Sequence, residues 1–394
     1  MLVPTDLARE RACWQRSRLL LEAATREPSL RREAHRMLWE TCQALGDRAA
    51  ALTHLGAALA DGAFFTRHRA SAQRPVRTVL MLCVPGDFQA NLPLDRLFDD
   101  NTLLHTLWIT DPAAALPSDL LQAMPFDCVF IAIAQDEHHA AALRAADTLA
   151  RVIDAPVINH GARIAELSRV RVAELLHDLP DAIVPEHVAR LRLHPAPVEY
   201  PLIIRPAGSH AGHGLEWIAD PDALADYDRR HRDPRGFTVS PFIDYRSADG
   251  QWRKYRIVFV DGVPYPLHLG IHHDWAVWYY NAGMELDPLK CEEENRFLHS
   301  LDAVFPAPAR SALRALADRV GLDYFGLDCG LMPDGRLLVF EVETGMIVHD
   351  RRSGAGRGAP DAAGRIRRAV EAMIDRRARC ASPVREVPAA VVST

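Results

Sequence analysis

Two apolar runs that each contain an acidic residue most constrain how this chain folds. Residues 325–331 and 337–343 are strand-like, and the Asp-Gly pair at 334–335 is a typical hairpin turn. We therefore expect two antiparallel neighbours in which Asp328 and Glu341 lie close together. Carboxylates inside an apolar hairpin are unfavourable unless a positive charge neutralises them.

Two kinds of partner could neutralise this hairpin. One is a buried salt bridge to an arginine, and the other is a magnesium ion bound by carboxylate oxygens. Strand periodicity places Glu341 and Glu343 on the same face. Because that arrangement suits a shared cation, we favour magnesium.

A glycine-rich segment follows another apolar strand. The strand at 201–206 ends in Arg205-Pro206, and the next residues include glycines at 208, 212 and 214. Glycines let backbone N–H groups surround phosphate oxygens, and an arginine neutralises their charge. Such a loop is weak evidence for a nucleotide when it is taken alone.

A second extended segment, at 238–245, is apolar up to Asp244. Its backbone could bind adenine and place Asp244 near a ribose hydroxyl. An ordinary core strand explains the same pattern equally well.

The pattern of apolar runs divides the 394 residues into five expected parts. The first has no strand-like run and resembles a single tetratricopeptide-type hairpin, although a plain helical cap explains it as well. The second alternates apolar strands with helices, which is typical of a parallel sheet covered on both faces. Two mixed regions with antiparallel hairpins and a flexible tail follow. The expected bounds are 1–72, 73–162, 163–236, 237–378 and 379–394.

The order of these features resembles the ATP-grasp superfamily, in the branch that holds glutathione synthetase and ribosomal-protein glutamate ligases. The resemblance covers residues 75–375 and rests on the IIRP strand, the glycine-rich loop, the extended linker and the GLDC…VFEVE hairpin. It implies an α/β and α+β chain, with an ATP-grasp fold preceded by a small doubly wound α/β domain and an N-terminal α-helical hairpin region. It also implies ATP and Mg²⁺ as cofactors, and an amide-forming carboxylate–amine ligase that works through an acyl phosphate.

The resemblance further implies a set of site residues. The metal ligands would be Asp328, Glu341 and Glu343. The family usually has lysine where this chain has Arg205 and asparagine where it has Glu343. The extra negative charge at 343 could tighten magnesium binding or mark an altered site. The ATP-binding residues would be Arg169, Arg205, Gly208, Ser209, His210, Gly212, Gly214, Ser240, Phe242, Ile243 and Asp244.

Two further groups are candidates for the chemistry. Lys254 and Arg256 alternate onto one face of a strand and could hold the triphosphate or the acyl phosphate, although a solvated strand edge also explains them. An aromatic and histidine-rich stretch could form a substrate-facing wall, and ordinary packing explains it nearly as well. Its histidine spacing matches no strong zinc pattern. The substrate candidates are His268, His272, His273, Trp275, Asn281 and Met346.

Composition narrows the class of protein. A hydrophobic content of 48%, a charged content of 25% and a net charge of −6 fit a globular chain and give no reason to expect nucleic acid or membrane partners. Seven dispersed cysteines without a CxxC pair indicate reduced thiols and a cytoplasmic protein. We expect a small-molecule or peptide substrate and a possible homodimer.

Three other functions are alternatives to the ligase. A kinase on the same fold would stop at phosphoryl transfer, and a nucleotide-binding scaffold would not turn ATP over. A Rossmann dehydrogenase is disfavoured because the strand at 78–84 ends in Pro85-Gly86-Asp87 and no GxGxxG follows it.

Overall fold

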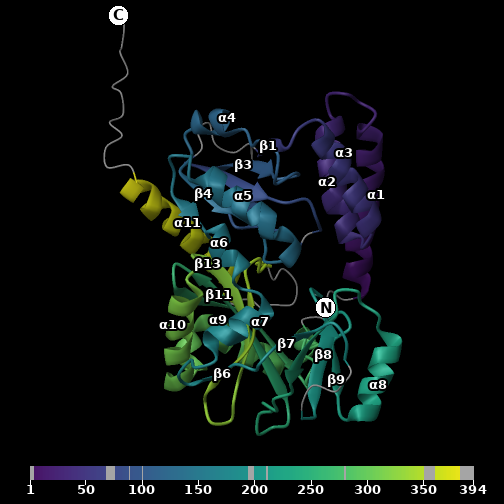
Figure 1. Cartoon of the computed structure of the whole chain (residues 1–394), viewed down its shortest axis with the longest axis vertical. Coiled ribbons are helices and arrows are strands. Elements are labelled where there is room, and N and C mark those ends of the chain that lie inside the picture. Colours follow the sequence, from purple (N-terminus) through teal and green to yellow (C-terminus); the bar gives the residue numbers. More distant parts are fainter. Residues whose placement is uncertain are drawn as a thin grey trace, which may run out of the picture.

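The computed structural model describes residues 4–67, 76–87, 89–99, 101–193, 199–209, 212–278, 281–349 and 360–381, which form helices around three sheets (Figure 1). The predicted ATP-binding residue His210 lies outside these ranges, as do residues 382–394 of the expected tail. Within them, no helix is both long and apolar enough to cross a bilayer.

Three antiparallel helices form the first part of the chain, at one side of the molecule (Figure 1). They are α1 (Pro4–Ala24), α2 (Arg31–Ala44) and α3 (Arg48–Ala60). Leu38 and Cys42 of α2 are fully buried, together with Leu55 of α3, and Asp47 caps α3 by accepting the backbone N–H of Ala50. The expectation of no strand before residue 66 was wrong, because β1 (Phe64–Arg67) pairs antiparallel with β3 of the first sheet.

The first sheet has the order β1-β3-β2-β4-β5. Its parallel strands are β2 (Arg77–Cys83), β3 (Thr102–Trp108), β4 (Cys128–Ile131) and β5 (Val157–Ile158). The connecting helices are η1 (Leu94–Arg96), α4 (Ser118–Gln122), η2 (Glu137–His139), α5 (Ala140–Ala150) and α6 (Gly161–Ala165).

Both faces of this sheet are buried, as a doubly wound arrangement requires. Along β2, Leu80 and Leu82 belong to the cluster that includes α5, whereas Val79 and Met81 belong to the cluster that includes α11 (Ala362–Ala381). The period of two residues along the strand therefore separates two cores.

The second and third sheets make up the mixed region. The second is antiparallel, in the order β7 (Val188–Arg190), β10 (Phe237–Pro241), β8 (Leu202–Pro206), β9 (Glu216–Ile218), with α8 (Pro221–Arg230) after β9. The third has the order β12 (Val263–His272), β11 (Trp252–Val260), β13 (Tyr324–Leu331), β14 (Leu337–Glu343), β6 (Ala182–Ile183). Its helices are α7 (Arg169–Leu176), η3 (Met284–Leu286), α9 (Pro288–His299), η4 (Leu301–Ala303) and α10 (Ala307–Val320).

Helix α11 lies between the first and third sheets (Figure 1). Its residues Val370 and Met373 are fully buried in the cluster that holds side chains of both sheets. Asp375 pairs with Arg77 of β2 at 2.6 Å, and Arg376 pairs with Asp261 of the β11–β12 turn at 2.7 Å. The helix continues to Ala381, past residue 379 where the tail was expected to begin.

A histidine pair gives the helical part a pH-dependent stability. The Nδ1 atoms of His35 on α2 and His54 on α3 are 2.9 Å apart. Burial lowers the pKa of both imidazoles, with further lowering from Arg31 at His35 and from His35 at His54. Because folding favours the neutral rings, the unfolded chain takes up protons more readily below about pH 6.5.

We expect the full contribution of this pair to the free energy of unfolding above about pH 6.5, and a loss as the pH falls below that value. Denaturant unfolding at about pH 7.5 and about pH 5.5 measures the loss. The double variant His35→Asn, His54→Asn should show a smaller loss. An equal loss in the variant would contradict the assignment.

Candidate functional site

The acidic hairpin forms as the sequence indicates. Strands β13 and β14 are antiparallel, and Asp328 is the register partner of Glu341. On the other side of β13, Arg256 of β11 is the register partner of Asp328. Three neighbouring strands therefore bring one cation and two acids into a row.

Asp328 is held between two cations. Its Oδ2 lies 2.6 Å from Nζ of Lys254, and its Oδ1 accepts a hydrogen bond from Nε of Arg256 at 2.8 Å. Only 5% of the Asp328 side chain is exposed. Burial tends to raise the pKa of this carboxyl, but the charges of Arg256 and Lys254 lower it well below its usual range. Lys254 and Arg256 share one face, as predicted, and are not a solvated strand edge.

Glu341 has a different cation. Arg169, the first residue of α7, pairs with its Oε1 and follows the N-cap residue Ser168. Burial tends to raise the pKa of Glu341, but Arg169 and Arg205 lower it overall. Burial and the negative charge of Glu341 raise the pKa of Glu343 to about 7. A cation beside these two acids would relieve that repulsion.

The three predicted metal ligands differ in how well they fit magnesium. Among the described residues, no three or more His, Cys, Asp or Glu side chains are grouped to hold a metal ion. Both oxygens of Asp328 already contact cations. Glu341 and Glu343 lie on one strand face, and their negative charges repel each other. A divalent ion bound by both would remove that repulsion, so these two residues fit magnesium. The role of Asp328 as a ligand stays a prediction.

The glycine-rich loop is held by Arg205 at the end of β8. Nε of Arg205 donates to Oγ of Ser209 at 3.0 Å, and its Nη2 donates to the Ser209 carbonyl. Burial and the charge of Arg169 lower the pKa of Arg205 to about 10. Gly208, Gly212 and Gly214 all have positive φ, and Gly212 at φ +74° packs against the indole of Trp278.

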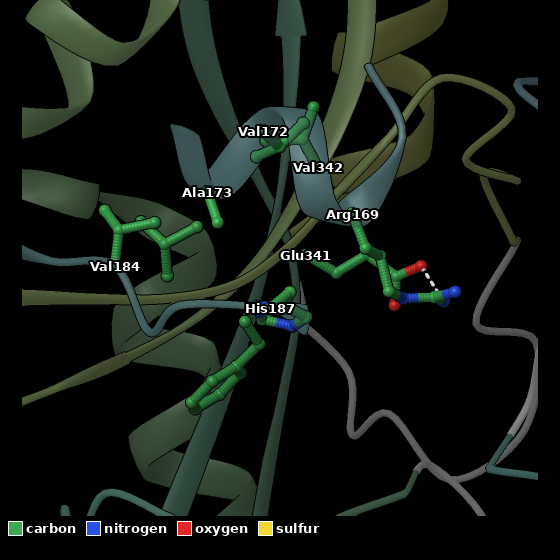
Figure 2. Close-up of a pocket in the computed structure, with 9 residues that line it drawn as sticks. Arg169, Val172, Ala173, Val184, His187, Glu341 and Val342 are labelled. Atoms are coloured by element: carbon green, nitrogen blue, oxygen red, sulfur yellow. Dashed lines mark hydrogen bonds and ion pairs between the residues drawn. The ribbon is translucent and has the colours of Figure 1, made fainter. Parts of the chain in front are cut away.

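A shallow pocket lies beside the Arg169–Glu341 pair (Figure 2). Val172 and Ala173 of α7, Val184 and His187 line it with residues of β14. His187 was missed from the sequence, because a single histidine in the connection after α7 belongs to no motif. Burial lowers the pKa of His187, with smaller effects of Arg169 and Glu341.

The predicted adenine segment is partly engaged in other contacts. Ser240 is buried in β10, and the backbone N–H of Phe242 donates to the Pro201 carbonyl at 3.0 Å. Ile243 packs on the aromatic cluster that includes Phe242. Asp244 is exposed and pairs with Arg246 at 2.6 Å. A role of these residues in binding adenine and ribose stays a prediction.

The predicted substrate wall does not form as one surface. Met346 is fully buried, and its carbonyl accepts a hydrogen bond from the Tyr324 hydroxyl at 2.7 Å, so Met346 is a core residue. Asn281 ties its own loop, accepting from the Trp278 N–H and donating to the Ala276 carbonyl. His268 contacts the buried Glu294 at 2.6 Å.

Three members of the predicted wall remain near one another. The ring centroids of His272 and His273 are 4.1 Å apart, and Trp275 follows two residues later in the sequence. Trp275 packs edge-on against Phe242. These residues stay candidates for contact with a substrate.

The cation pair around Asp328 predicts an unequal response to two aspartate substitutions on one hairpin. Asp328→Asn leaves two partly buried cations with less negative charge, and we expect a loss of about 3–5 kcal/mol in the free energy of unfolding. Asp334→Asn removes the exposed pair with Arg336, and the resulting change in the free energy of unfolding should be too small to resolve. Denaturant unfolding compares the two. Equal losses would contradict the buried pairing.

Two glycines of nearly equal φ test the loop packing. Gly212 at +74° contacts Trp278, whereas Gly250 at +77° has open space around it. Gly250→Ala should cost only the backbone strain, about 1–2 kcal/mol. Gly212→Ala should cost about 1–3 kcal/mol more, because the methyl group would overlap the indole. Equal costs in denaturant unfolding would exclude tight packing of Trp278 on the loop.

Comparison with other proteins gives similarity in structure only. No family model matches the sequence, and no curated protein matches it. The RimK domain protein ATP-grasp of Sphaerobacter thermophilus DSM 20745 has 19% identity and a TM-score of 0.44, over 75% of this chain and 99% of that one. A D-alanine–D-alanine ligase of Bacillus anthracis complexed with ATP has 13% identity and a TM-score of 0.48, over 78% of this chain and 99% of that one. The ATP-grasp ligase PsnB, complexed with minimal precursor, Mg and ADP, has 16% identity and a TM-score of 0.41, over 75% of this chain and 98% of that one. All three similarities lie below 20% identity and below a TM-score of 0.5.

Proposed function

We propose that this chain is an ATP-dependent carboxylate–amine ligase that forms an amide through an acyl phosphate. One observation supports this above all. The glycine-rich loop with Arg205 lies beside Arg169, and Arg169 in turn contacts Glu341 next to Glu343. A polyanion and a divalent cation would each find complementary charge there.

Arg205 is the group that most favours a phosphate. Among the described residues, Arg205 forms no salt bridge, and the hydrogen bonds of its guanidinium go to Ser209. Burial and the nearby charge of Arg169 both disfavour the charged form of Arg205. An anion bound between the two arginines would compensate for that cost, and phosphate oxygens match the planar guanidinium.

Glu341 and Glu343 are the residues that would hold magnesium. When bound, the ion would neutralise charge between these acids and the phosphates. Lys254 and Arg256 lie on the same sheet face and keep fixed positions because both contact Asp328. We assign them to stabilise charge on the transferred phosphoryl group and on the acyl phosphate, where preorganised cations are most effective.

A peptide is a candidate acceptor because of where the helical part lies. Nε1 of Trp39 on α2 donates to the Gly86 carbonyl at 3.1 Å, and Arg48 of α3 pairs with Asp87 at 3.1 Å. These contacts place the helices beside the loop that leaves the carboxyl end of β2. A chain bound on the helices could reach the site across that loop. We also propose a cytoplasmic location, which seven dispersed cysteines without a CxxC pair support.

The test is magnesium-dependent ATP turnover with a panel of L-amino acids and short peptides. We expect ADP and phosphate only when both a carboxylate and an amine are present, and a loss of about 10²-fold or more in Glu341→Gln. Glu216→Gln, which alters a carboxylate on β9 paired with Arg230, should retain turnover.

Two other outcomes would replace the proposal. A phosphorylated product without amide would indicate a kinase. ATP binding without turnover, even with cell extract as the source of substrate, would indicate a scaffold, and Glu343→Asn would then test whether the acid is responsible.

A further inference from the structure

The acidic strand β14 and the glycine-rich loop form two sides of the candidate site. The carboxyl edge of the first sheet forms a third. Strands β3 and β4 lie on opposite sides of β2, so the order in which strands are added to the sheet reverses between β2 and β4. Ligands of parallel α/β sheets bind outside the carboxyl ends of the strands at such a point. The loops that leave β2 and β4 are joined there, because the Ala134 N–H donates to the Ala90 carbonyl at 2.9 Å.

Consecutive residues of the loop after β4 contact the end of the acidic strand β14 and approach the glycine-rich loop. The backbone N–H of Gln135 donates to Oγ1 of Thr344 at 2.8 Å, directly after Glu343. Asp136 approaches the glycine-rich loop, since its Oδ2 lies 3.9 Å from the position that a methyl group on Gly208 would occupy. The loop therefore spans the distance between the acidic strand and the phosphate loop.

This loop contains a carboxylate–imidazole pair. Oδ1 of Asp136 lies 2.7 Å from Nδ1 of His138. Burial tends to raise the pKa of Asp136, but hydrogen bonds from His138 lower it, so the carboxylate is ionised at neutral pH. An ionised carboxylate only accepts, so Nδ1 carries the hydrogen, and Nε2 of the neutral ring then has a lone pair. The His138 side chain is 72% exposed and can meet a substrate.

Resting on the proposed ligase function, we propose that His138, oriented by Asp136, is the general base that deprotonates the amine acceptor. An amine arrives at neutral pH as an ammonium ion and cannot attack. Nε2 removes one proton, and the freed nitrogen lone pair forms the C–N bond with the acyl carbon. The C–O bond to the phosphate breaks with its electron pair. The second N–H proton leaves with phosphate, and the imidazolium returns its proton to water.

The surroundings suit this role. The charged and titratable groups near the Asp136–His138 pair include Glu137 and His139 on the same loop, and Arg235 from the loop before β10, which interacts with Asp136. Nδ1 of His139 is 2.9 Å from the Ala134 carbonyl, so His139 is held separately from Asp136. Nη1 of Arg235 lies 2.9 Å from the methyl position on Gly208, and Nη2 of the same side chain pairs with Asp233. Asp136 is thus the carboxylate that orients His138.

The first test needs no substrate. In the full chain labelled with ¹⁵N-histidine, the His138 ring should show the Nδ1–H tautomer at neutral pH, and its signal is identified by its absence in His138→Gln. Asp136→Asn should change the tautomer balance. An Nε2–H tautomer in the wild type would overturn the proposal.

The second test separates the amine step from acyl phosphate formation. Each of the L-amino acids is offered as the carboxylate with ATP and magnesium, and either hydroxylamine or L-alaninamide is the amine. Hydroxylamine is uncharged at neutral pH and needs no base, whereas L-alaninamide must lose a proton. In His138→Gln, amide formation should fall about 10²-fold relative to hydroxamate formation.

His160→Gln is the matched control, because His160 is also an exposed histidine beside an aspartate, Asp147, at 3.6 Å. It should leave the amide-to-hydroxamate ratio unchanged. An unchanged ratio in His138→Gln would overturn the role of His138 while leaving the ligase intact. Failure of every carboxylate to give ADP or hydroxamate would instead count against the proposed function.

Discussion

A single buried carboxylate determines the arrangement of charges in this molecule. Asp328 neutralises both Lys254 and Arg256, and it can do so only if β11, β13 and β14 keep their observed register. A shift of one residue would move every side chain of a strand to the opposite face. With those two cations occupied, Glu341 pairs with Arg169, and Arg205 is left without a carboxylate partner among the described residues. The excess of positive charge beside the glycine-rich loop is a consequence of that division.

The hairpins could be predicted because their signals are local. Apolar alternation and Asp-Gly turns specify β11–β12 and β13–β14 within about twenty residues each. The pairing of Asp328 with Arg256 could not be predicted in the same way. It depends on β11 lying beside β13, although 72 residues separate the two side chains. The sequence offered both a salt bridge and magnesium as partners, and only the three-dimensional register shows which acid has which partner.

The substrate candidates show the limit of composition as a guide. Histidines and aromatic residues between 268 and 281 suggested one wall, but several side chains of the predicted set have separate partners. His268 contacts Glu294, and Asn281 closes its loop. Met346 follows the acidic strand in sequence, yet it packs beneath Gly326 in the core. Conversely, Asp136 and His138 belong to no motif, and only the folded structure, through the strand order of the first sheet and the Gln135–Thr344 hydrogen bond, indicates that their loop borders the site.

The position of α11 has a consequence for how the chain folds during synthesis. Residues 362–381 follow all three sheets in sequence, yet they fill the space between the first and third. Until that helix has left the ribosome, the apolar faces that contain Val79, Met81, Val258 and Val260 lack the α11 side chains that pack in the same cluster. The two sheets can form early, but they cannot complete their shared core early. Such nascent chains expose apolar surface for the time needed to translate the remaining residues, and this makes them natural clients of chaperones that bind such surfaces.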